Sequence, residues 1–205
     1  LLAACRARPA DDLPRLVLAD WLDEHGQPER AEFVRIQVEV SHPSADVARI
    51  RRLKKREAEL LAEYENEWTG GYAEVATALN AAPPLRFVRG MVRVADATLY
   101  IDRQELRQWL TSPVLPWLEQ IDITFTNPGW FVKADLPDEL HGRIGLTLRV
   151  EEHLTDERRK QYRVLAASGN FAGVRSLTIM GADVDAVLNE ITTAEVANLV
   201  SVRVV

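Results

Sequence analysis

The chain has 205 residues, of which 47% are hydrophobic and 27% are charged, and its formal net charge is -6. This composition is ordinary for a folded protein and excludes an intrinsically disordered chain. The acidic balance disfavours a general affinity for nucleic acid, and the single cysteine, Cys5, excludes an internal disulfide. Since no run of 18 apolar residues occurs, neither a transmembrane helix nor a membrane partner is expected, and the predicted location is cytoplasmic.

Residues 1–43 predict a helical module. Leu18, Trp21 and Leu22 recur at helical spacing and form one apolar stripe, and Gly26 stands where a helix commonly ends. We expect the large ring of Trp21 to be buried against Phe33 and Leu18. The alternative is that Trp21 is an exposed anchor for a partner.

Residues 44–84 predict a long charged helix followed by a shorter one. The first half of the long helix is basic and the second half is acidic. The basic residues are Arg49, Arg51, Arg52, Lys54, Lys55 and Arg56. They are the candidate contact for a polyanion such as nucleic acid. Pairs such as Lys55 and Glu59, four residues apart on a helix, favour instead a solvated or internally paired face.

Residues 85–205 predict a short, degenerate leucine-rich-repeat-like solenoid. Short apolar alternations begin 29, 25, 31 and 25 residues apart, at Val92, Ile121, Leu146, Leu177 and Val202. A repeat of this length is typical of a solenoid whose units bury their apolar faces on one another. The predicted fold class is therefore α/β: a helical module followed by parallel strands with helices on their outer side.

Three helices are expected between these strands, over residues 102–110, 156–167 and 183–193. The repeat departs from the usual pattern because the asparagine or cysteine that normally follows each strand is replaced by Thr126, Glu151 and Ala182. Arg143 also occupies a position that is usually apolar, and residues 127–140 are predicted to be irregular. The apolar end of the chain predicts a last strand, whose edge either further chain would cover or a partner would bind.

Residues 9–37 carry a more specific pattern, which ends in RLVLADWLDEHGQPERAEFVRIQ over residues 15–37. This segment resembles the repeat-companion domain, a short module of planctomycete bacteria that is often found beside leucine-rich-type repeats. Residues 86–92 are similar to the strand that usually opens the repeat region in such proteins. The resemblance implies a bacterial origin and an association with repeats, and it implies no activity.

A cluster of ionisable side chains closes the first long predicted helix: Asp20, Asp23, Glu24 and His25. Carboxylates and an imidazole can form a metal site or an acid–base pair. The metal-ligand spacing H-E-x-x-H is missing, as are nucleophile and phosphate-loop motifs, so no catalytic residue and no cofactor is expected. The favoured alternative is structural, in which Asp20 binds Arg15, Arg35 or a backbone amide.

The solenoid prediction also gives an open sheet face that would line the concave side. Its candidate partner-binding residues are Gln120, Asp122, Thr124, Thr147, Arg149, Ser176, Thr178, Met180, Ser201 and Arg203. Either a protein partner binds this mixed polar surface, or the surface is only solvated sheet. The first functional hypothesis is therefore a non-catalytic protein-interaction or scaffold module. The alternatives are a nucleic-acid-associated component that uses residues 49–56 and an enzyme or metal site at Asp20–His25.

Overall fold

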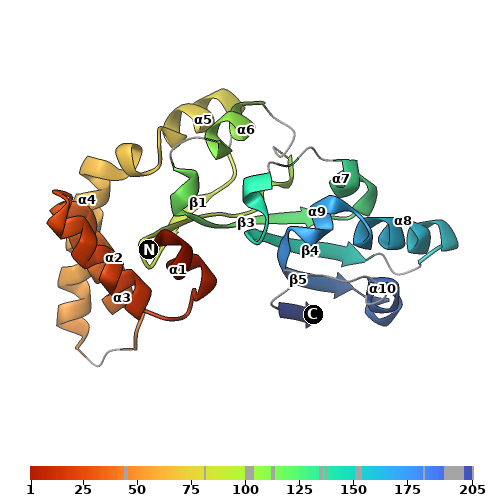
Figure 1. The fold of residues 1–205 in the computed structure, drawn as a ribbon, viewed down its shortest axis with the longest axis horizontal. Coiled ribbons are helices and arrows are strands. Elements are labelled where there is room, and N and C mark those ends of the chain that lie inside the picture. Colours follow the sequence, from red (N-terminus) through yellow and green to blue (C-terminus); the bar gives the residue numbers. More distant parts are fainter. Residues whose placement is uncertain are drawn as a thin grey trace.

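The computed structural model describes residues 1–43, 46–80, 82–99, 104–111, 114–133, 136, 138–150, 154–181, 183–191 and 201–204. The chain has a mixed α/β fold, with its first helices gathered at one end and a sheet with further helices at the other (Figure 1). The predicted α/β class is confirmed at this level.

In the described residues, the helical part contains five helices: α1 (Leu2–Ala7), α2 (Leu13–Glu24), α3 (Pro28–Val40), α4 (Val47–Trp68) and α5 (Tyr72–Leu79). Helix α2 ends just before Gly26, whose φ of +75° suits a residue without a side chain. Helix α4 begins after Asp46, whose carboxylate accepts a 2.8 Å hydrogen bond from the amide of Arg49. Both signals come from residues at the helix ends themselves. The two helices therefore begin and end close to the residues predicted from the sequence.

Within the part of the chain that the structure describes, the sheet has six strands: β1 (Leu85–Val88), β2 (Met91–Val94), β3 (Leu118–Phe125), β4 (Ile144–Val150), β5 (Val174–Gly181) and β6 (Ser201–Val204). The strands lie side by side in chain order, β1 antiparallel to β2 and all later neighbours parallel. Each of the five predicted apolar alternations falls within one of the strands β2 to β6. The sequence therefore located the parallel strands correctly.

The single strand predicted over residues 86–92 is wrong, because the structure divides it into the hairpin β1–β2. Arg89 and Gly90 form the two-residue turn, and both have positive φ, +50° and +82°. A two-residue turn with two positive φ angles matches the twist of the strands that it joins. The strand reversal is therefore set by the pair Arg89–Gly90.

The remaining elements connect the strands: η1 (Ala97–Leu99), α6 (Gln104–Leu110), η2 (Leu115–Trp117), α7 (Pro128–Lys133), η3 (Asp138–Leu140), α8 (Asp156–Ala166), α9 (Gly169–Ala172) and α10 (Val184–Ile191). Helix α7 and the turn η3 lie within residues 127–140, so the predicted irregular insert is partly helical. Parts of the helices predicted over 102–110 and 183–193, together with Glu151 and Ala182, lie outside the described residues.

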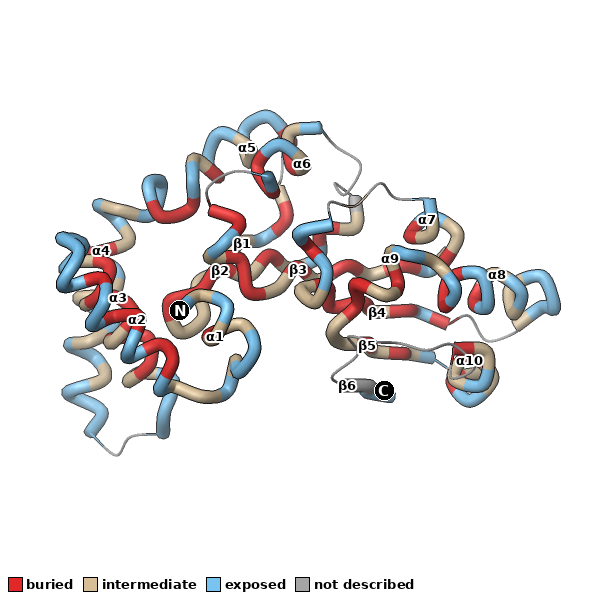
Figure 2. Tube along the Cα trace, viewed as in Figure 1, coloured by how far each residue is buried: buried red, intermediate tan, exposed pale blue. Residues whose placement is uncertain are grey.

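One apolar core joins the sheet to the helices α6, α7, α8 and α10. The inward strand positions, such as Ile121, Leu146 and Leu177, are buried together with Trp109 of α6 and Leu165 of α8. Figure 2 shows buried residues along the strands and on the sides of the helices that face them. The opposite sheet face keeps the polar members of each alternation.

Two aromatic contacts attach the helical part to the sheet. In the first, the ring of Phe33 of α3 packs against the ring of Phe87 of β1, with ring centroids 5.0 Å apart. The same ring also packs against Trp68 of α4 within the helical part, at 4.9 Å between centroids. The guanidinium of Arg30 lies 3.6 Å from the ring centroid of Trp117, beside the start of β3. Burial lowers the pKa of Arg30 to about 9, although the negative charge of Glu67 acts to raise it. The helical part and the sheet therefore share a packed interface.

Gly90 is the point where the hairpin turn meets α3, and Gly90→Ala is expected to destabilise the fold. A Cβ atom at this position would lie 2.6 Å from Cγ2 of Val34, and the backbone φ is +82°. Strain at positive φ and overpacking together predict a loss of about 2–4 kcal/mol in the free energy of unfolding. Denaturant unfolding measures this loss.

Gly26→Ala is the matched control, because its φ is +75° but no atom lies within 4 Å of the added Cβ. Only the backbone cost of about 1–2 kcal/mol applies there. Equal losses for the two variants would contradict the close approach of Val34 to the turn.

Candidate functional site

An apolar stripe lies exposed on the outer face of α2. We define the α2 stripe as Leu13, Leu16, Val17 and Trp21. These positions follow one another at helical spacing, and Leu13 is 63% exposed and Trp21 is 41% exposed. The opposite face of the same helix is buried in the module. A run of exposed large apolar side chains is typical of a surface that contacts another macromolecule.

The prediction that Trp21 is a core residue is wrong. Its ring stacks on the imidazole of His25, with ring centroids 4.0 Å apart, and it does not fill the space beside Phe33. Phe33 packs against Trp68 of α4 instead. Leu18 and Leu22 take the buried face of α2, and Trp21 therefore lies on the solvent side. The alternative role of Trp21 as an exposed anchor remains a prediction.

An apolar hollow of about 430 Å³ adjoins the α2 stripe. Its walls come from α1, α2 and η2, and they are Leu1, Leu2, Ala3, Leu18, Trp21 and Trp117. Trp21 thus belongs both to the stripe and to the wall of the hollow. An apolar side chain of a partner would lose its contact with water in this hollow. In protein interfaces, the few side chains that fill such desolvated pockets carry most of the binding energy.

The carboxylates at the end of α2 make structural ion pairs. Asp20 accepts a 2.8 Å hydrogen bond from Arg35, and Asp23 lies 2.6 Å from the same guanidinium. The hydrogen bond from Arg35 to Asp20 is the main cause of the raised pKa of Arg35. Nδ1 of His25 lies 2.7 Å from the carbonyl oxygen of Trp21. The predicted pair of Asp20 and Arg35 is confirmed, and in the described part of the chain no three acidic, histidine or cysteine side chains are grouped to hold a metal ion.

The strand positions predicted to line an open sheet face lie beside one another on neighbouring strands, and their role in binding stays a prediction. Thr124, Thr147, Thr178 and Arg203 are register partners across β3 to β6. Arg149 and Arg203 are exposed, whereas the other predicted positions whose side chains are described are half-buried: Gln120, Asp122, Thr124, Thr147, Ser176, Thr178 and Met180. Ser201 aligns with Ser176 in the backbone register, and its side chain lies outside the described residues.

Two of these open-face residues reach a hollow with polar and apolar walls at the carboxyl ends of β3 and β4. The hollow measures about 370 Å³ and brings Thr124 and Arg149 together with Asp96, Asn127 and the exposed Trp130. The hydroxyl of Thr98, which also lines it, donates a 2.7 Å hydrogen bond to the carbonyl oxygen of Thr124. The sequence placed Thr124 and Arg149 on this face but did not associate Asp96 or Trp130 with them.

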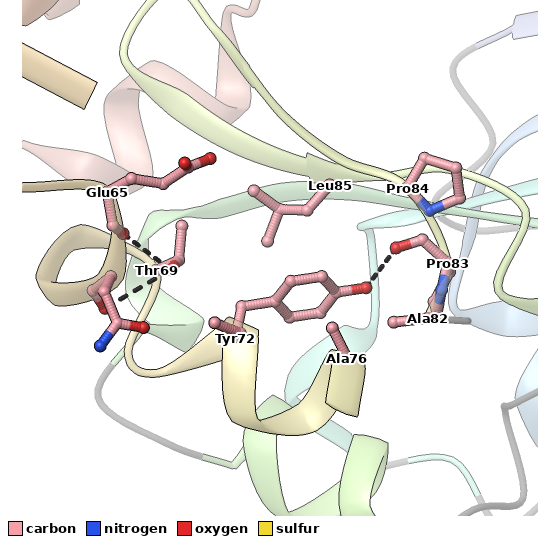
Figure 3. A pocket seen from close by; sticks show the side chains of 10 residues that line it. Glu65, Thr69, Tyr72, Ala76, Ala82, Pro83, Pro84 and Leu85 are labelled. Atoms are coloured by element: carbon pink, nitrogen blue, oxygen red, sulfur yellow. Dashed lines mark hydrogen bonds between the residues drawn. The ribbon is translucent and has the colours of Figure 1, made fainter. Parts of the chain in front are cut away.

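A third hollow, of about 340 Å³, lies between the end of α4, α5 and the segment that enters β1 (Figure 3). The hydroxyl of Tyr72 is directed at the carbonyl oxygen of Pro83 and donates a hydrogen bond to it. Thr69 donates a 2.7 Å hydrogen bond to the carbonyl oxygen of Glu65. The polar groups that Figure 3 connects are thus used by the fold itself.

The basic half of α4 is partly neutralised within the fold. Arg49 pairs with Glu39, Arg56 donates a 2.8 Å hydrogen bond to Glu32, and Lys55 lies 3.8 Å from Glu59. The pair of Lys55 and Glu59 is the one that helical spacing predicted. The other cations of the stretch are Arg51, Arg52 and Lys54, and all three are exposed on the helix surface. The structure favours a paired face for half of these charges.

Together these features define a mixed α/β protein in which a helical part is packed against a mainly parallel six-stranded sheet. Comparison with protein-family models, with curated proteins and with solved structures finds no match to this chain. In the described residues, no helix is both long and apolar enough to cross a membrane.

Proposed function

We propose that this chain is a non-catalytic protein-interaction module. It combines a helical module of the repeat-companion type with degenerate leucine-rich-repeat-like units, and it presents the α2 stripe to a partner protein. The parallel strands that follow one another in chain order support the repeat-like description. The exposure of the α2 stripe beside an apolar hollow is the observation that carries the proposed binding function.

The α2 stripe supports protein binding better than the open sheet face does. The open face is polar and mostly half-buried, with exposed arginines at its margin. The stripe instead offers contiguous apolar side chains, among them a tryptophan, beside the exposed carboxylates of Glu24 and of Asp20, which pairs with Arg35. A desolvated tryptophan surrounded by polar groups is typical of the centre of an interface.

Affinity capture from a lysate of the source organism, followed by mass spectrometry, tests this proposal. The stripe variant carries Leu13→Ser, Leu16→Ser and Trp21→Ala, and the intact chain is expected to enrich a partner that this variant loses. Once that partner is in hand, Trp21→Ala alone should weaken its binding about thirtyfold, because hot-spot tryptophans contribute about 2 kcal/mol or more.

Two further variants separate the explanations. The control carries Val47→Ser and Val164→Ser, which remove exposed apolar side chains elsewhere, and it should capture the partner as well as the intact chain does. The open-face variant carries Asp122→Ala, Arg149→Ala, Thr178→Ala and Arg203→Ala. A partner lost only by the open-face variant would move the interface to the sheet, and capture of no partner by the intact chain would overturn the proposal.

A further inference from the structure

Three neighbouring strands contribute side chains to the hollow of about 370 Å³ at their carboxyl ends. Asp96 lies two residues after β2, Asn127 lies two residues after β3, and Arg149 is the penultimate residue of β4. In open α/β sheets, small ligands bind in the crevice beyond the carboxyl ends of the strands. The volume also lies within the range of roughly 300–1,000 Å³ that is usual for small-molecule sites. We call Asp96, Asn127, Trp130 and Arg149 the strand-end site.

The apolar wall of the hollow comes from two aromatic rings with different roles. Phe125, the last residue of β3, is 3% exposed, and its ring packs edge to face against Phe131 of α7, with ring centroids 5.6 Å apart. Trp130, also in α7, is 64% exposed. In the described part of the chain, no other aromatic ring stacks on Trp130. Its ring is therefore available as a flat apolar surface for a ligand in the hollow.

The charged groups of the strand-end site are of opposite sign and have much hydrogen-bonding capacity left. The carboxylate of Asp96 only accepts hydrogen bonds, and the guanidinium of Arg149 only donates them. The hydroxyl of Thr98 lies 3.3 Å from Oδ1 of Asp96, but its single proton is used in the 2.7 Å hydrogen bond to the carbonyl oxygen of Thr124. Among the residues that the structure describes, neither Asp96 nor Arg149 forms an ion pair. Both groups can therefore bind a ligand.

Asn127 and Thr126 add uncharged polar groups to the same hollow. Oδ1 of Asn127 accepts a 3.0 Å hydrogen bond from the amide of Gly129 at the start of α7, which orients the side-chain amide. The NH2 group of that amide carries two donors. Thr126 is exposed, and its hydroxyl both donates and accepts. The site thus combines one flat ring with donors and acceptors from three strand ends.

We propose that the strand-end site binds the pyranose ring of a neutral saccharide. One face of a pyranose consists largely of C–H groups, which pack on an aromatic ring such as that of Trp130, while the hydroxyls at its edge both donate and accept. Two adjacent hydroxyls match the two oxygens of Asp96, and two sugar oxygens match the guanidinium fork of Arg149. The proposal does not depend on the α2 stripe, because none of these residues belongs to α2.

The balance of charge favours a neutral ligand over a nucleotide or another anion. Among the described residues that line the hollow, Arg149 is the one cation and Asp96 is the one carboxylate. A phosphate group would therefore meet as much negative as positive charge, and the formal net charge of -6 opposes its approach further. The competing explanation is a solvated hollow in which Trp130 is only a surface residue.

Saturation-transfer-difference NMR on the full chain is the first measurement, because it reports which protons of a ligand touch the protein. The probes are the methyl pyranosides of glucose, galactose, mannose, N-acetylglucosamine and xylose. We expect at least one of them to bind with a Kd of about 1 mM or lower. Its strongest saturation transfer should fall on the C–H protons of one ring face. Sorbitol has similar hydroxyls but no ring, and it should give no signal.

Substitutions in the strand-end site should weaken the binding of that pyranoside. Trp130→Ala should raise the Kd about tenfold or more, whereas Trp130→Phe keeps a smaller flat ring and should retain most of the affinity. Asp96→Asn and Arg149→Gln should each raise the Kd about tenfold, because charge-assisted hydrogen bonds are lost. Asparagine also tolerates the φ of +53° at position 96, so the backbone there should be kept. Thermal unfolding checks that each variant is folded.

The matched control is Arg52→Gln, which removes an exposed cation from α4 and should leave the affinity unchanged. The proposal is overturned if none of the pyranosides binds, if sorbitol gives an equal signal, or if Trp130→Ala binds as well as the intact chain. Binding of adenosine monophosphate in the absence of binding by any pyranoside would also overturn it, and would assign the hollow to nucleotides.

The source of the saccharide is resolved by a comparison of chain lengths. The pyranoside that binds is tested beside the trisaccharide built from the same sugar. Tighter binding of the trisaccharide assigns the site to a unit of a polysaccharide, because neighbouring sugars then add contacts outside the hollow. Equal or weaker binding of the trisaccharide assigns the site to a free sugar.

Discussion

Glu119→Ala is expected to lower the free energy of unfolding by about 3–5 kcal/mol, because it leaves a fully buried arginine without its counter-ion. Arg15 and Glu119 are 0% and 1% exposed, and they form a direct ion pair. Arg93 shares the same carboxylate from the side of β2. Equilibrium unfolding in urea or guanidinium chloride, followed by circular dichroism, measures the loss.

Glu119→Gln should lose less than Glu119→Ala, since the amide oxygen still accepts hydrogen bonds from the arginines. Glu39→Ala is the surface control, because it breaks the exposed pair with Arg49 and should change the stability little. A loss for Glu119→Ala no larger than for Glu39→Ala would show that the buried pair does not form in solution.

Phe33→Ala is expected to cost about 3–5 kcal/mol in the free energy of unfolding, through the cavity that it leaves. Phe33 is 1% exposed and packs against Trp68 of α4 and Phe87 of β1. It therefore joins three elements, and a cavity at this point weakens the attachment of the helical part to the sheet. The same denaturant titration measures the loss in the free energy of unfolding. Near-ultraviolet circular dichroism should report the loosened environment of Trp68.

Phe33→Leu keeps most of the apolar volume and should lose clearly less than Phe33→Ala. Trp130→Ala removes a larger ring from an exposed position and should leave the stability nearly unchanged. A cost for Phe33→Ala close to that of Trp130→Ala would contradict the packing of α3 between α4 and β1.

The sequence predicted the elements whose signals are local. The recurrence of alternations from Val92 to Val202 located the strands β2 to β6, because each alternation follows the two-residue period of a strand. The hairpin turn at Arg89–Gly90 was missed because Arg89 adopts a positive φ that its residue type does not announce. Helix α7 was missed because its segment is short and lacks a clear apolar period.

The candidate site was predicted only in part. Alternation alone decides which face of a strand a residue occupies, so the open-face residues were placed on one side of the sheet, and their role in binding stays a prediction. The exposed stripe was missed, although the sequence of α2 carries apolar residues on both sides: Leu13, Leu16 and Val17 in addition to Leu18 and Leu22. Apolar residues on two sides of one helix were the available signal, because a helix packed on a single core needs only one apolar face.

The arginine network lay beyond any local pattern. Arg15 and Glu119 are separated by 104 positions, and the contact exists only because the module folds back onto the third strand. No single-sequence periodicity links two such positions. Arg143 was recognised as a departure from the apolar repeat, but its partner at the turn η2 follows only from the tertiary arrangement.

The position of α1 changes how the sheet comes apart. Because the strands lie side by side in chain order, each strand is held mainly by hydrogen bonds to its two neighbours. Strands could therefore detach one at a time, beginning with β6. The hydrogen bond from Arg175 to Arg6 connects β5 directly to the first helix, across the intervening strands. Release of β5 therefore also removes a support of α1, which couples the local opening of these two elements thermodynamically.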